Sequence, residues 1–447
     1  MRRAYFVATI SVAAALLGAC VNNDQVWGTG DGGLQFDGYT PTGDAYVHPG
    51  LPRPKCAANT QVTITGKVTA PNQADPVPGA AVYIPSNVPE DFPLEVRCEV
   101  CKQAGQTTNR WWTTTTAYNG SFTLKDVCPG SYWLIMQNGR FRRAIKITVP
   151  TGGNMQIKAG ESRLPRKNKE FTIHDTVPKI AVATGDYDKM ECVLLKMGLD
   201  NSAYHLYEGA KLLKNKNLKT SFADLVKNYN LLKTYNIVFI NCTDNTFETQ
   251  LKNSAVVQNL TNYVKAGGRL YITDWSYDWM EQLPELAGYI DFEPGVSDGT
   301  PETQNKAALG KGDIKVLADI KDPALAKWLG QFGGAIQNGK SQISHFLTQW
   351  VIMHKVSKDV KTWVTGVISS ITGSISGSRP LTVTFNYKNC GKALFSSYHT
   401  EGRDDELKAY PAPAKPFPNY CTGQISPQDR ILEYLIFDIA NCVTPVL

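Results

Sequence analysis

The chain has 447 residues, of which 42% are hydrophobic and 19% charged, with 46 Lys and Arg against 40 Asp and Glu. A disordered chain would be poorer in apolar residues and richer in charge, and a collagen-like fibre would place its 37 glycines at a fixed period, so both classes are excluded. The length predicts two or three domains at about 150 residues each, and the formal charge of +6 gives no reason to expect a nucleic-acid partner.

Residues 1–19 have the pattern of an export signal. Arg2 and Arg3 form a short basic start, and an apolar run extends from residue 4 to residue 17, broken only by Thr9 and Ser11. This run is too short for a membrane-spanning helix and is typical of a secretory signal peptide. Loss of the two arginines with the signal would lower the formal charge from +6 to +4.

The end of this signal, Leu17-Gly18-Ala19-Cys20, resembles the lipobox of bacterial lipoproteins. The resemblance implies that Cys20 becomes the acylated first residue of the mature chain. Acyl chains contribute about 0.8 kcal/mol per buried CH₂ and would hold the protein on a membrane without a spanning helix. Val21 at the next position resembles lipoproteins of enteric-type bacteria that are sent to the outer membrane, on either its periplasmic or its outer side. An ordinary signal peptide with an incidental cysteine is the alternative.

Residues 20–55, which begin with the lipidated cysteine, are expected to form a flexible tether. From Val21 to Lys55 the sequence contains seven Gly and four Pro and has no apolar period. Such a segment has too little apolar surface to pack and behaves as a spacer.

Residues 56–164 are expected to fold as an all-β domain. Asn119-Gly120 lies between two β-prone runs and is typical of a tight hairpin turn, because both of its positions need positive φ. Short strands at this spacing, with turn residues between them, predict a β-sandwich. The expected strands fall at residues 61–68, 77–84, 113–124 (with the turn inside), 126–135 and 141–149.

Four motifs of this region resemble the carboxypeptidase regulatory-like, transthyretin-type β-sandwich. They are Gly66-Lys67-Val68, Pro78-Gly-Ala-Ala-Val82, Thr116-x-x-Asn119-Gly120-Ser-Phe122 and Pro129-Gly-x-Tyr132. The resemblance implies a non-catalytic accessory module. Trp111, Trp112 and Trp133 could form an aromatic platform for sugar rings, although packing in the core is the plainer interpretation.

After a basic linker at 165–178, residues 179–447 change pattern. Apolar runs at 179–185, 236–242 and 269–274 alternate with helical segments, which is typical of a parallel sheet covered on both faces. We therefore predict a doubly wound α/β domain of flavodoxin-like type, with an irregular insert at about 288–379. Its other expected elements are helices at 190–198, 221–235 (with Ser221 as N-cap), 253–266 and 429–441, and a hairpin of 380–387 with 392–398.

In sheets of this type, ligands bind outside the carboxyl ends of the strands. The residues that follow those strand ends include many acids and one histidine, which we expect to lie on one rim. Asp186, Asp244 and Asp278 could instead be helix N-caps. The rim residues are Asp186 and Asp188, then Asn241, Cys242 and Asp244, then Asp274, Trp275, Ser276 and Asp278, and finally His399 and Glu401.

Gly267-Gly-Arg-Leu-Tyr-Ile-Thr-Asp274, with the later Ser397-Tyr-His399-Thr-Glu401, resembles the class I glutamine amidotransferase-like superfamily and its ThuA-like branch. The resemblance implies that His399 and Glu401 match the late His-x-Glu pair of the catalytic triad. The nucleophilic Cys of the family is missing, because Asp274, Trp275 and Ser276 stand at that strand end and bulky neighbours do not suit a strained nucleophile turn. Glutaminase activity is therefore not expected.

Nine cysteines besides Cys20 are disulfide candidates in an exported protein. We expect two disulfides inside the first domain, and one free or intermolecular thiol among the remaining five cysteines. A zinc site or a redox pair at the Cys-x-x-Cys motif is the less favoured interpretation. The candidates are Cys56, Cys98, Cys101, Cys128, Cys192, Cys242, Cys390, Cys421 and Cys442.

This organisation is compatible with two functions. The first is an outer-membrane lipoprotein that binds an envelope protein or glycan, with a non-catalytic amidotransferase-like domain and no cofactor. The second is an envelope hydrolase in which Ser276 is the nucleophile, His399 the base and Glu401 its orienting partner. A variant of the second uses Asp274, Asp278 and His399 to hold a divalent cation, Ca²⁺ or Mg²⁺, that activates water.

Overall fold

The computed structural model describes residues 52–99, 109–209, 218–243, 247–294, 302–312, 314–388, 390–400 and 417–443. These residues all fall within one structural unit of the chain, residues 33–447. The predicted signal peptide, the lipobox and Cys20 lie outside the described residues. None of the helices among the described residues combines the length and the apolar character needed to span a membrane.

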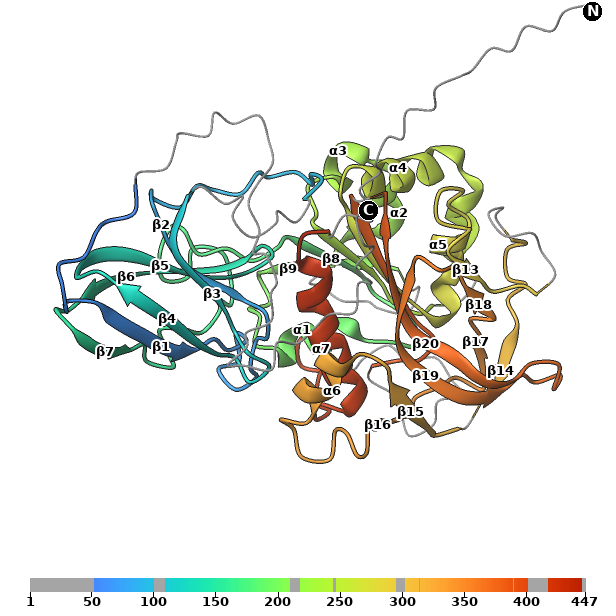
Figure 1. The fold of residues 1–447 in the computed structure, drawn as a ribbon. Coiled ribbons are helices and arrows are strands. Elements are labelled where there is room, and N and C mark those ends of the chain that lie inside the picture. Colours follow the sequence, from blue (N-terminus) through green and yellow to red (C-terminus); the bar gives the residue numbers. More distant parts are fainter. Residues whose placement is uncertain are drawn as a thin grey trace, which may run out of the picture. The chain divides into compact units, whose positions relative to one another are not determined.

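The N-terminal part consists of a three-stranded and a four-stranded sheet (Figure 1), consistent with the β-sandwich expected from the sequence. β1 lies in the centre of the smaller sheet, antiparallel to β4 and parallel to β7. The smaller sheet contains β1 (Val62–Lys67), β4 (Ser121–Val127) and β7 (Gly153–Gln156). The larger sheet, in the order β3-β2-β5-β6, contains β2 (Ala81–Pro85), β3 (Arg110–Thr115), β5 (Gly130–Asn138) and β6 (Phe141–Val149).

The predicted hairpin at Asn119-Gly120 is wrong. Gly120 does turn the chain with φ +78°, but β3 before it belongs to the larger sheet and β4 after it to the smaller one. The buried Thr116 explains the change of sheet, because its hydroxyl donates to Val77 O at 2.6 Å and accepts from Ala80 N at 2.8 Å. These bonds take the chain out of the larger sheet before the turn. A tight hairpin is found instead between β5 and β6, closed by the pair Asn138–Phe141.

The C-terminal part is built on a ten-stranded sheet in the order β10-β9-β8-β11-β12-β21-β20-β19-β15-β16. Neighbouring strands from β10 to β21 are parallel, and those from β21 to β16 are antiparallel. The parallel strands are β8 (Ile180–Ala183), β9 (Tyr204–Glu208), β10 (Leu218–Ser221), β11 (Ile237–Ile240), β12 (Arg269–Thr273) and β21 (Gly391–Ser396). The others are β15 (Val316–Ile320), β16 (Lys340–Ile343), β19 (Val360–Ser369) and β20 (Ser376–Tyr387).

The segment expected to be an irregular insert is irregular only in part, since it contains strands and a helix. Three of its strands, β15, β16 and β19, extend the main sheet beyond β20. It also holds α6 (Pro323–Leu329) and the short strands β13 (Ile290–Asp291), β14 (Leu309–Lys311), β17 (Gln349–Val351) and β18 (Lys355–Val356). β19 and β20 form a long antiparallel pair, and β20 in turn pairs with β21, which confirms the predicted hairpin of 380–387 with 392–398.

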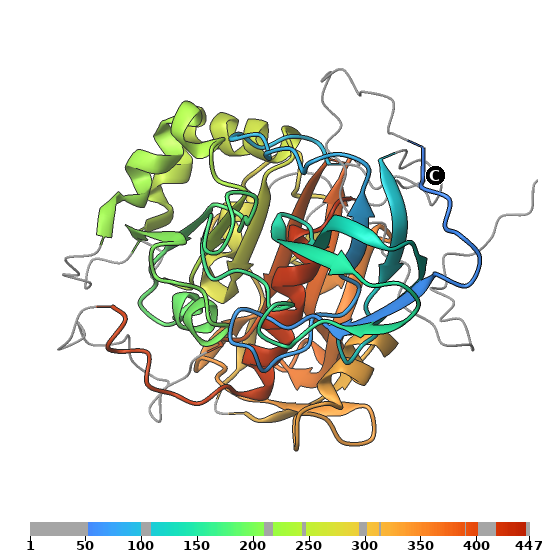
Figure 2. The same ribbon diagram turned by 90° about the vertical axis from the view of Figure 1, so that its left-hand side faces the viewer.

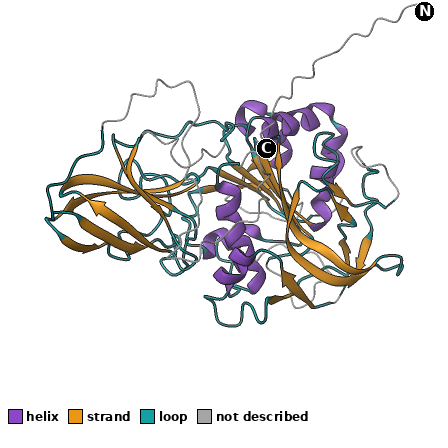
Figure 3. Ribbon diagram, viewed as in Figure 1, coloured by secondary structure: helices purple, strands orange, loops and turns teal. Residues whose placement is uncertain are grey.

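Helices pack on both faces of the sheet (Figures 1 and 3). Every second strand residue, such as Ala181, Val238 and Leu270, joins a core with α2 and α4. α7 lies against the opposite face (Figure 2), where Arg269 and Lys392 of the strands bond to its last turn. The helices are α1 (Met190–Lys196), α2 (Phe222–Lys227), α3 (Tyr229–Leu232), α4 (Ser254–Lys265), α5 (Asp278–Glu281) and α7 (Pro427–Ala440), with 3-10 turns η1 (Phe247–Lys252) and η2 (Asp274–Tyr277).

The single helix expected at 221–235 is divided in two. Ser221 caps the first part as predicted, accepting from Ala223 N at 3.1 Å. Asn228 then leaves the helical conformation, with φ −106° and ψ 90°, and its side chain caps α3 by accepting from Leu231 N at 3.1 Å. The apolar period of the segment is therefore kept while the backbone bends around the core.

The disulfides correct one expectation. Cys56 pairs with Cys128 inside the sandwich, but Cys98 pairs with Cys390, at the start of β21. The prediction of two disulfides confined to the first domain is therefore wrong. In the second part Cys192 pairs with Cys421, Cys442 is also disulfide-bonded, and Cys242 is the free cysteine of the described residues. Cys101 lies outside the described residues.

A buried carboxylate lies between two arginines that come from different parts of the chain. Glu99 is 2% exposed and pairs with Arg140, in the turn between β5 and β6, at 2.7 Å. Its other oxygen is 3.3 Å from Arg269, the first residue of β12. The N–H of Val443 donates to the Glu99 carbonyl at 2.7 Å. Ion pairs and backbone bonds thus join the segment around Cys98 to the main sheet.

Candidate functional site

The carboxyl ends of four adjacent parallel strands, β8, β11, β12 and β21, meet at one edge of the main sheet. From β8 the chain goes to β9 and β10 on one side, and then returns to β11 on the other side. This reversal makes a topological switch point, the usual place for a ligand in an open parallel sheet. Most of the rim residues predicted from the sequence lie on the segments that leave these strands.

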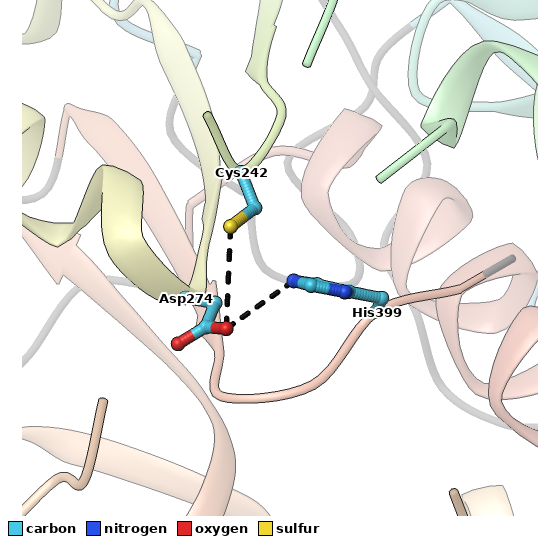
Figure 4. A group of neighbouring side chains, drawn as sticks. All are labelled: Cys242, Asp274 and His399. Atoms are coloured by element: carbon cyan, nitrogen blue, oxygen red, sulfur yellow. Dashed lines mark hydrogen bonds and ion pairs between the residues drawn. The ribbon is translucent and has the colours of Figure 1, made fainter. Parts of the chain in front are cut away.

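Three of the rim side chains form one buried cluster (Figure 4): Cys242 after β11, Asp274 after β12 and His399 after β21. The Sγ of Cys242 lies 4.0 Å from Asp274 Oδ2, and His399 Nε2 lies 3.2 Å from the same oxygen. One ligand atom of each residue falls within 4.8 Å of those of the other two. Cys242 and Asp274 are 0% exposed and His399 is 2% exposed.

The surrounding structure fixes each member of the cluster. Asp274 adopts a left-handed backbone, φ +42°, and its second oxygen Oδ1 accepts from Val351 N at 2.7 Å. The N–H of Cys242 donates to Thr273 Oγ1 at 2.9 Å. The backbone of His399 donates to His345 O at 3.1 Å and accepts from Gln428 Nε2 at 3.0 Å. A buried non-glycine residue with positive φ is a form of strain that collects at functional sites.

Burial dominates the electrostatics of the cluster. It raises the pKa of the Asp274 carboxyl, while the hydrogen bond and charge of His399 act in the opposite direction. Burial also raises the pKa of the Cys242 thiol well above its ordinary value, and the charge of Asp274 raises it further. A thiol in this environment keeps its proton at neutral pH unless a cation is close by.

The order of the three groups does not suit nucleophilic catalysis. In a catalytic triad the base lies between the nucleophile and the acid, so that it can remove the nucleophile's proton. Here the Asp274 carboxylate faces both the thiol and the imidazole, and its Oδ2 is the atom that they share. The arrangement is better suited to hold a proton or a cation at one point than to activate a nucleophile.

Ser276, the nucleophile of the predicted hydrolase, is directed elsewhere. It is fully buried in η2, and its hydroxyl donates to the carbonyl of Asn241 at 2.8 Å. This bond occupies the hydroxyl with a backbone acceptor of the neighbouring strand end. Glu401, the proposed orienting residue, lies outside the described residues.

The acids that come after β8 are held within the rim. Asp186 Oδ2 accepts from the Thr243 hydroxyl at 2.6 Å, and Asp188 Oδ1 accepts from the Thr400 hydroxyl at 2.8 Å. These bonds link β8 to the segments after β11 and β21. Asp186 is not a helix N-cap, since Lys189 holds that position before α1. Asp244, another predicted rim residue, lies outside the described residues.

Asp278 belongs to a second buried group. It opens α5, and its Oδ2 accepts from Asn305 N at 3.0 Å. Burial raises the pKa of Asp278 and of Glu302 to about 6 and about 7. The same cause raises the pKa of Glu281, one turn along α5, to about 9. The structure therefore separates Asp278 from Asp274 and His399, with which the sequence analysis had grouped it.

Sequence reasoning missed two features of the rim. Cys242 was placed on the rim and also among the disulfide candidates, but its grouping with Asp274 and His399 in one cluster was not predicted. Glu191 was not singled out, although it is buried and accepts from Asn241 Nδ2 at 2.8 Å and the Tyr420 hydroxyl at 2.6 Å. Burial raises the pKa of Glu191 to about 6. The odd number of cysteines was the available signal for the first feature; the second had none in the sequence.

Comparison with known proteins identifies no family for the chain. Among protein-family models none matches the chain, and none of the curated proteins does. A crystal structure of a Bacteroides uniformis protein described as carbohydrate-binding is 15% identical over 22% of this chain and 39% of its own, with a TM-score of 0.15. Two mutants of a type II cohesin–X-dockerin complex from Acetivibrio cellulolyticus are 19% and 17% identical, over 32% of this chain and 88% of theirs, with TM-scores of 0.17. The match thus spans about two fifths of the Bacteroides protein, and at these TM-scores no similarity supports an argument about fold or function.

Proposed function

We propose that this chain is a lipoprotein anchored to the outer membrane through Cys20, and that it acts as a binding or assembly module of the cell envelope. Its second domain, in this proposal, has an amidotransferase-like α/β fold without hydrolase activity. The motif Leu17-Gly18-Ala19-Cys20 carries the proposed anchor. The hydrogen bond of Ser276 to Asn241 O carries the proposed lack of hydrolase activity, because it directs the candidate nucleophile to the backbone. The position of Asp274 between the thiol of Cys242 and the imidazole of His399 adds to it.

Several further features support this proposal. The six parallel strands, with helices on both faces, are what an amidotransferase-like domain requires. The paired sheets of the N-terminal part suit a carboxypeptidase regulatory-like accessory module. The disulfides suit a protein that is exported to an oxidising compartment.

The partner in this proposal is an envelope glycan or an envelope protein. Trp112 is 3% exposed and its indole N–H donates to Asp126 O at 2.7 Å, so it belongs to the core. Trp111 and Trp133 are half-buried. Trp133 packs beside Tyr83 and Ile135. Trp111 instead contacts Tyr132, whose side chain points to the opposite face of β5. A stacking surface for sugar rings would therefore use one of these two tryptophans and not both. Sedimentation of the mature protein with insoluble envelope glycan, comparing wild type with Trp111→Ala and Trp133→Ala, separates a glycan partner from a protein partner.

The lipid anchor and the proposed lack of hydrolase activity are tested together in cells from which the chromosomal gene for this protein has been deleted. Wild type, Cys20→Ala and Ser276→Ala are expressed at equal levels and labelled with an alkyne analogue of palmitate. We expect Cys20→Ala to lose the label and to leave the membrane fraction, because no other lipid anchor is proposed. We expect Ser276→Ala to keep the label, the membrane location and the envelope phenotype of the wild type.

Three results would contradict the proposal. Labelling of the Cys20→Ala protein would show that the acyl group is attached to another residue. Loss of the envelope phenotype in Ser276→Ala, with the thermal midpoint of the purified protein preserved, would favour the hydrolase. Labelling of Ser276 by a fluorophosphonate probe in the wild-type protein would favour it as well.

A further inference from the structure

We propose that Cys242, Asp274 and His399 form a binding site for a divalent transition-metal ion of the zinc class. This inference is independent of the proposed function, because it depends only on the three side chains and their surroundings. Each ligand comes from the end of a different parallel strand, β11, β12 and β21. Cys242 and Asp274 are 32 positions apart and His399 lies much further along the chain. This spacing matches no zinc ribbon, so the folded sheet alone brings the three residues together.

The spacing of the donor atoms fits such an ion. With metal–sulfur distances near 2.3 Å and metal–nitrogen or metal–oxygen distances near 2.0–2.2 Å, tetrahedral ligand atoms lie about 3.3–3.6 Å apart. His399 Nε2 and Asp274 Oδ2 are 3.2 Å apart, and Cys242 Sγ is 4.0 Å from the same Oδ2. All three atoms lie within 4.8 Å of one another. Movements of less than about 1 Å would therefore complete the coordination.

The donor types select the class of metal. Sulfur and imidazole nitrogen favour zinc and neighbouring transition metals, whereas Ca²⁺ and Mg²⁺ prefer oxygen ligands only. The oxygen-rich site expected from the sequence, with Asp274 and Asp278, would have favoured Ca²⁺ or Mg²⁺. Because the structure places Cys242 beside Asp274, and Asp278 in another buried group, the donor set here is one sulfur, one nitrogen and one oxygen.

The charge balance also favours a divalent ion. When the ion binds, Cys242 gives up its thiol proton to solvent, and a neutral imidazole offers the lone pair of Nε2 to the metal. The thiolate and the carboxylate then carry two negative charges, which the two positive charges of the ion neutralise. The three buried ligands and the ion are thus left without net charge, which lowers the cost of burying them. The buried Asp188, whose charge acts on both Cys242 and Asp274, adds to the attraction for a cation.

The residues around the cluster support this role. Metal-binding carboxylates are usually held by a second hydrogen bond, and Asp274 Oδ1 accepts one from Val351 N at 2.7 Å. Three protein ligands leave the fourth tetrahedral position for water or a ligand atom, as in zinc sites that are not purely structural. The ion would connect the ends of three neighbouring strands at the switch point of the sheet.

The test is cobalt titration of the full mature protein, untagged and stripped with a chelator. Co²⁺ is used because it takes zinc sites and reports thiolate ligation by a charge-transfer band in the near ultraviolet. We expect the band to saturate at one equivalent and to disappear when one equivalent of Zn²⁺ is added. Among the described residues Cys242 is the free cysteine, and the Cys242→Ala variant shows whether the thiolate signal comes from it.

Variants decide whether these three residues are the ligands. Cys242→Ala should abolish the band, and Asp274→Asn and His399→Gln should lower Co²⁺ affinity at least tenfold. Asp278→Asn is the matched control, because it removes a buried carboxylate of the next turn and should leave the band and the affinity unchanged. Folding of each variant is checked by near-ultraviolet circular dichroism without metal.

The proposal is overturned if the wild type shows no band at several equivalents of Co²⁺, or if Cys242→Ala retains it. If a variant of one of the three ligands fails to fold, a measurement on the wild-type protein still tests the proposal. Alkylation of the Cys242 thiol during unfolding in denaturant should be slowed by stoichiometric Zn²⁺, and unchanged alkylation would count against the site.

Discussion

Glu281, at the end of α5, is a carboxyl group that the fold keeps away from water. It is 1% exposed, and its Oε1 accepts from the N–H of Glu302. Burial is the main cause that raises its pKa from 4.5 to about 9, and the charge of Glu302 adds to it. Between pH 4.5 and about pH 9, Glu281 therefore holds a proton in the folded protein that it has already released in the unfolded chain.

This buried acid predicts a pH dependence of stability. Because the folded state binds more protons above pH 4.5, the free energy of unfolding should fall as pH rises towards 9, by up to about 1.4 kcal/mol per pH unit for this group. Glu281→Gln removes the ionisation and keeps the acceptor oxygen. Urea unfolding between pH 6 and pH 8 should therefore show a flatter slope for the variant and a higher stability than wild type at pH 8.

Glu285 is the matched control on the same segment. Its pairing with Lys265, and its bonds from Tyr387 and Lys388, lower its pKa to about 2. Stability from this group is present above pH 4.5 and lost only as pH falls towards 2, so Glu285→Gln should leave the slope between pH 6 and pH 8 as in wild type. An equal change of slope in both variants would contradict the assignment to Glu281.

At the scale of elements, the sequence predicted best where a pattern acts locally. The buried strands at 180–183, 237–240 and 269–273 follow from their apolar runs. The ends of α4 and α7 lie within two residues of those expected at 253–266 and 429–441. Asn119-Gly120 does make a turn, but the sequence does not say whether its two strands pair. That choice depends on Thr116, whose hydrogen bonds reach residues 77 and 80.

The candidate site was predictable to the level of the rim and no further. Asp274, Cys242 and His399 were all placed at strand ends, because parallel strands bring those ends together. Which side chains meet depends on backbone angles such as the positive φ of Asp274, and on η2, which turns Ser276 towards Asn241. Neither the backbone angle of Asp274 nor the 3-10 turn η2 can be predicted from the spacing of apolar residues in the sequence.

The hairpin between β5 and β6 depends on a glycine that approaches α7. Gly139 has φ +54°, and a Cβ at this position would lie 2.0 Å from Ala440 O, at the end of that helix. Gly139→Ala should therefore cost more than the ~1–2 kcal/mol of a left-handed alanine alone. Gly153→Ala is the control, since Gly153 has φ +84° but no atom within 4 Å of the added Cβ.

Urea unfolding of the two glycine variants measures the difference. Gly153→Ala should lose only about 1–2 kcal/mol, from its backbone conformation. Equal losses in the two variants would show that the contact between Gly139 and Ala440 O is not made in solution.

At the scale of the whole molecule, Glu99 helps to hold distant segments together. Its carboxylate lies between Arg140 and Arg269, all three nearly inaccessible to water. Glu99→Gln leaves two buried guanidinium groups without their counter-charge, and breaking a buried ion pair costs about 3–5 kcal/mol. We expect a loss near the lower figure, since Arg269 also donates to the carbonyls of Ile439 and Gly267.

An exposed ion pair provides the contrast. Asp319 and Lys340 lie 2.6 Å apart with side chains 43% and 40% exposed, so water and salt screen their attraction. Asp319→Asn should leave the thermal midpoint of the protein within error of wild type. A Glu99→Gln midpoint equally unchanged would show that the buried pairs contribute nothing to stability.

The disulfide between Cys98 and Cys390 constrains the order in which the protein can mature. The bond closes a loop across 292 positions of sequence. In the export that we propose, Cys98 crosses the membrane long before Cys390 does. Until Cys390 is available, the Cys98 thiol therefore stays reduced, or it forms a transient disulfide with another cysteine that is exchanged later. Once the loop is closed, a single proteolytic cut between residues 165 and 178 releases no fragment until a reductant is added.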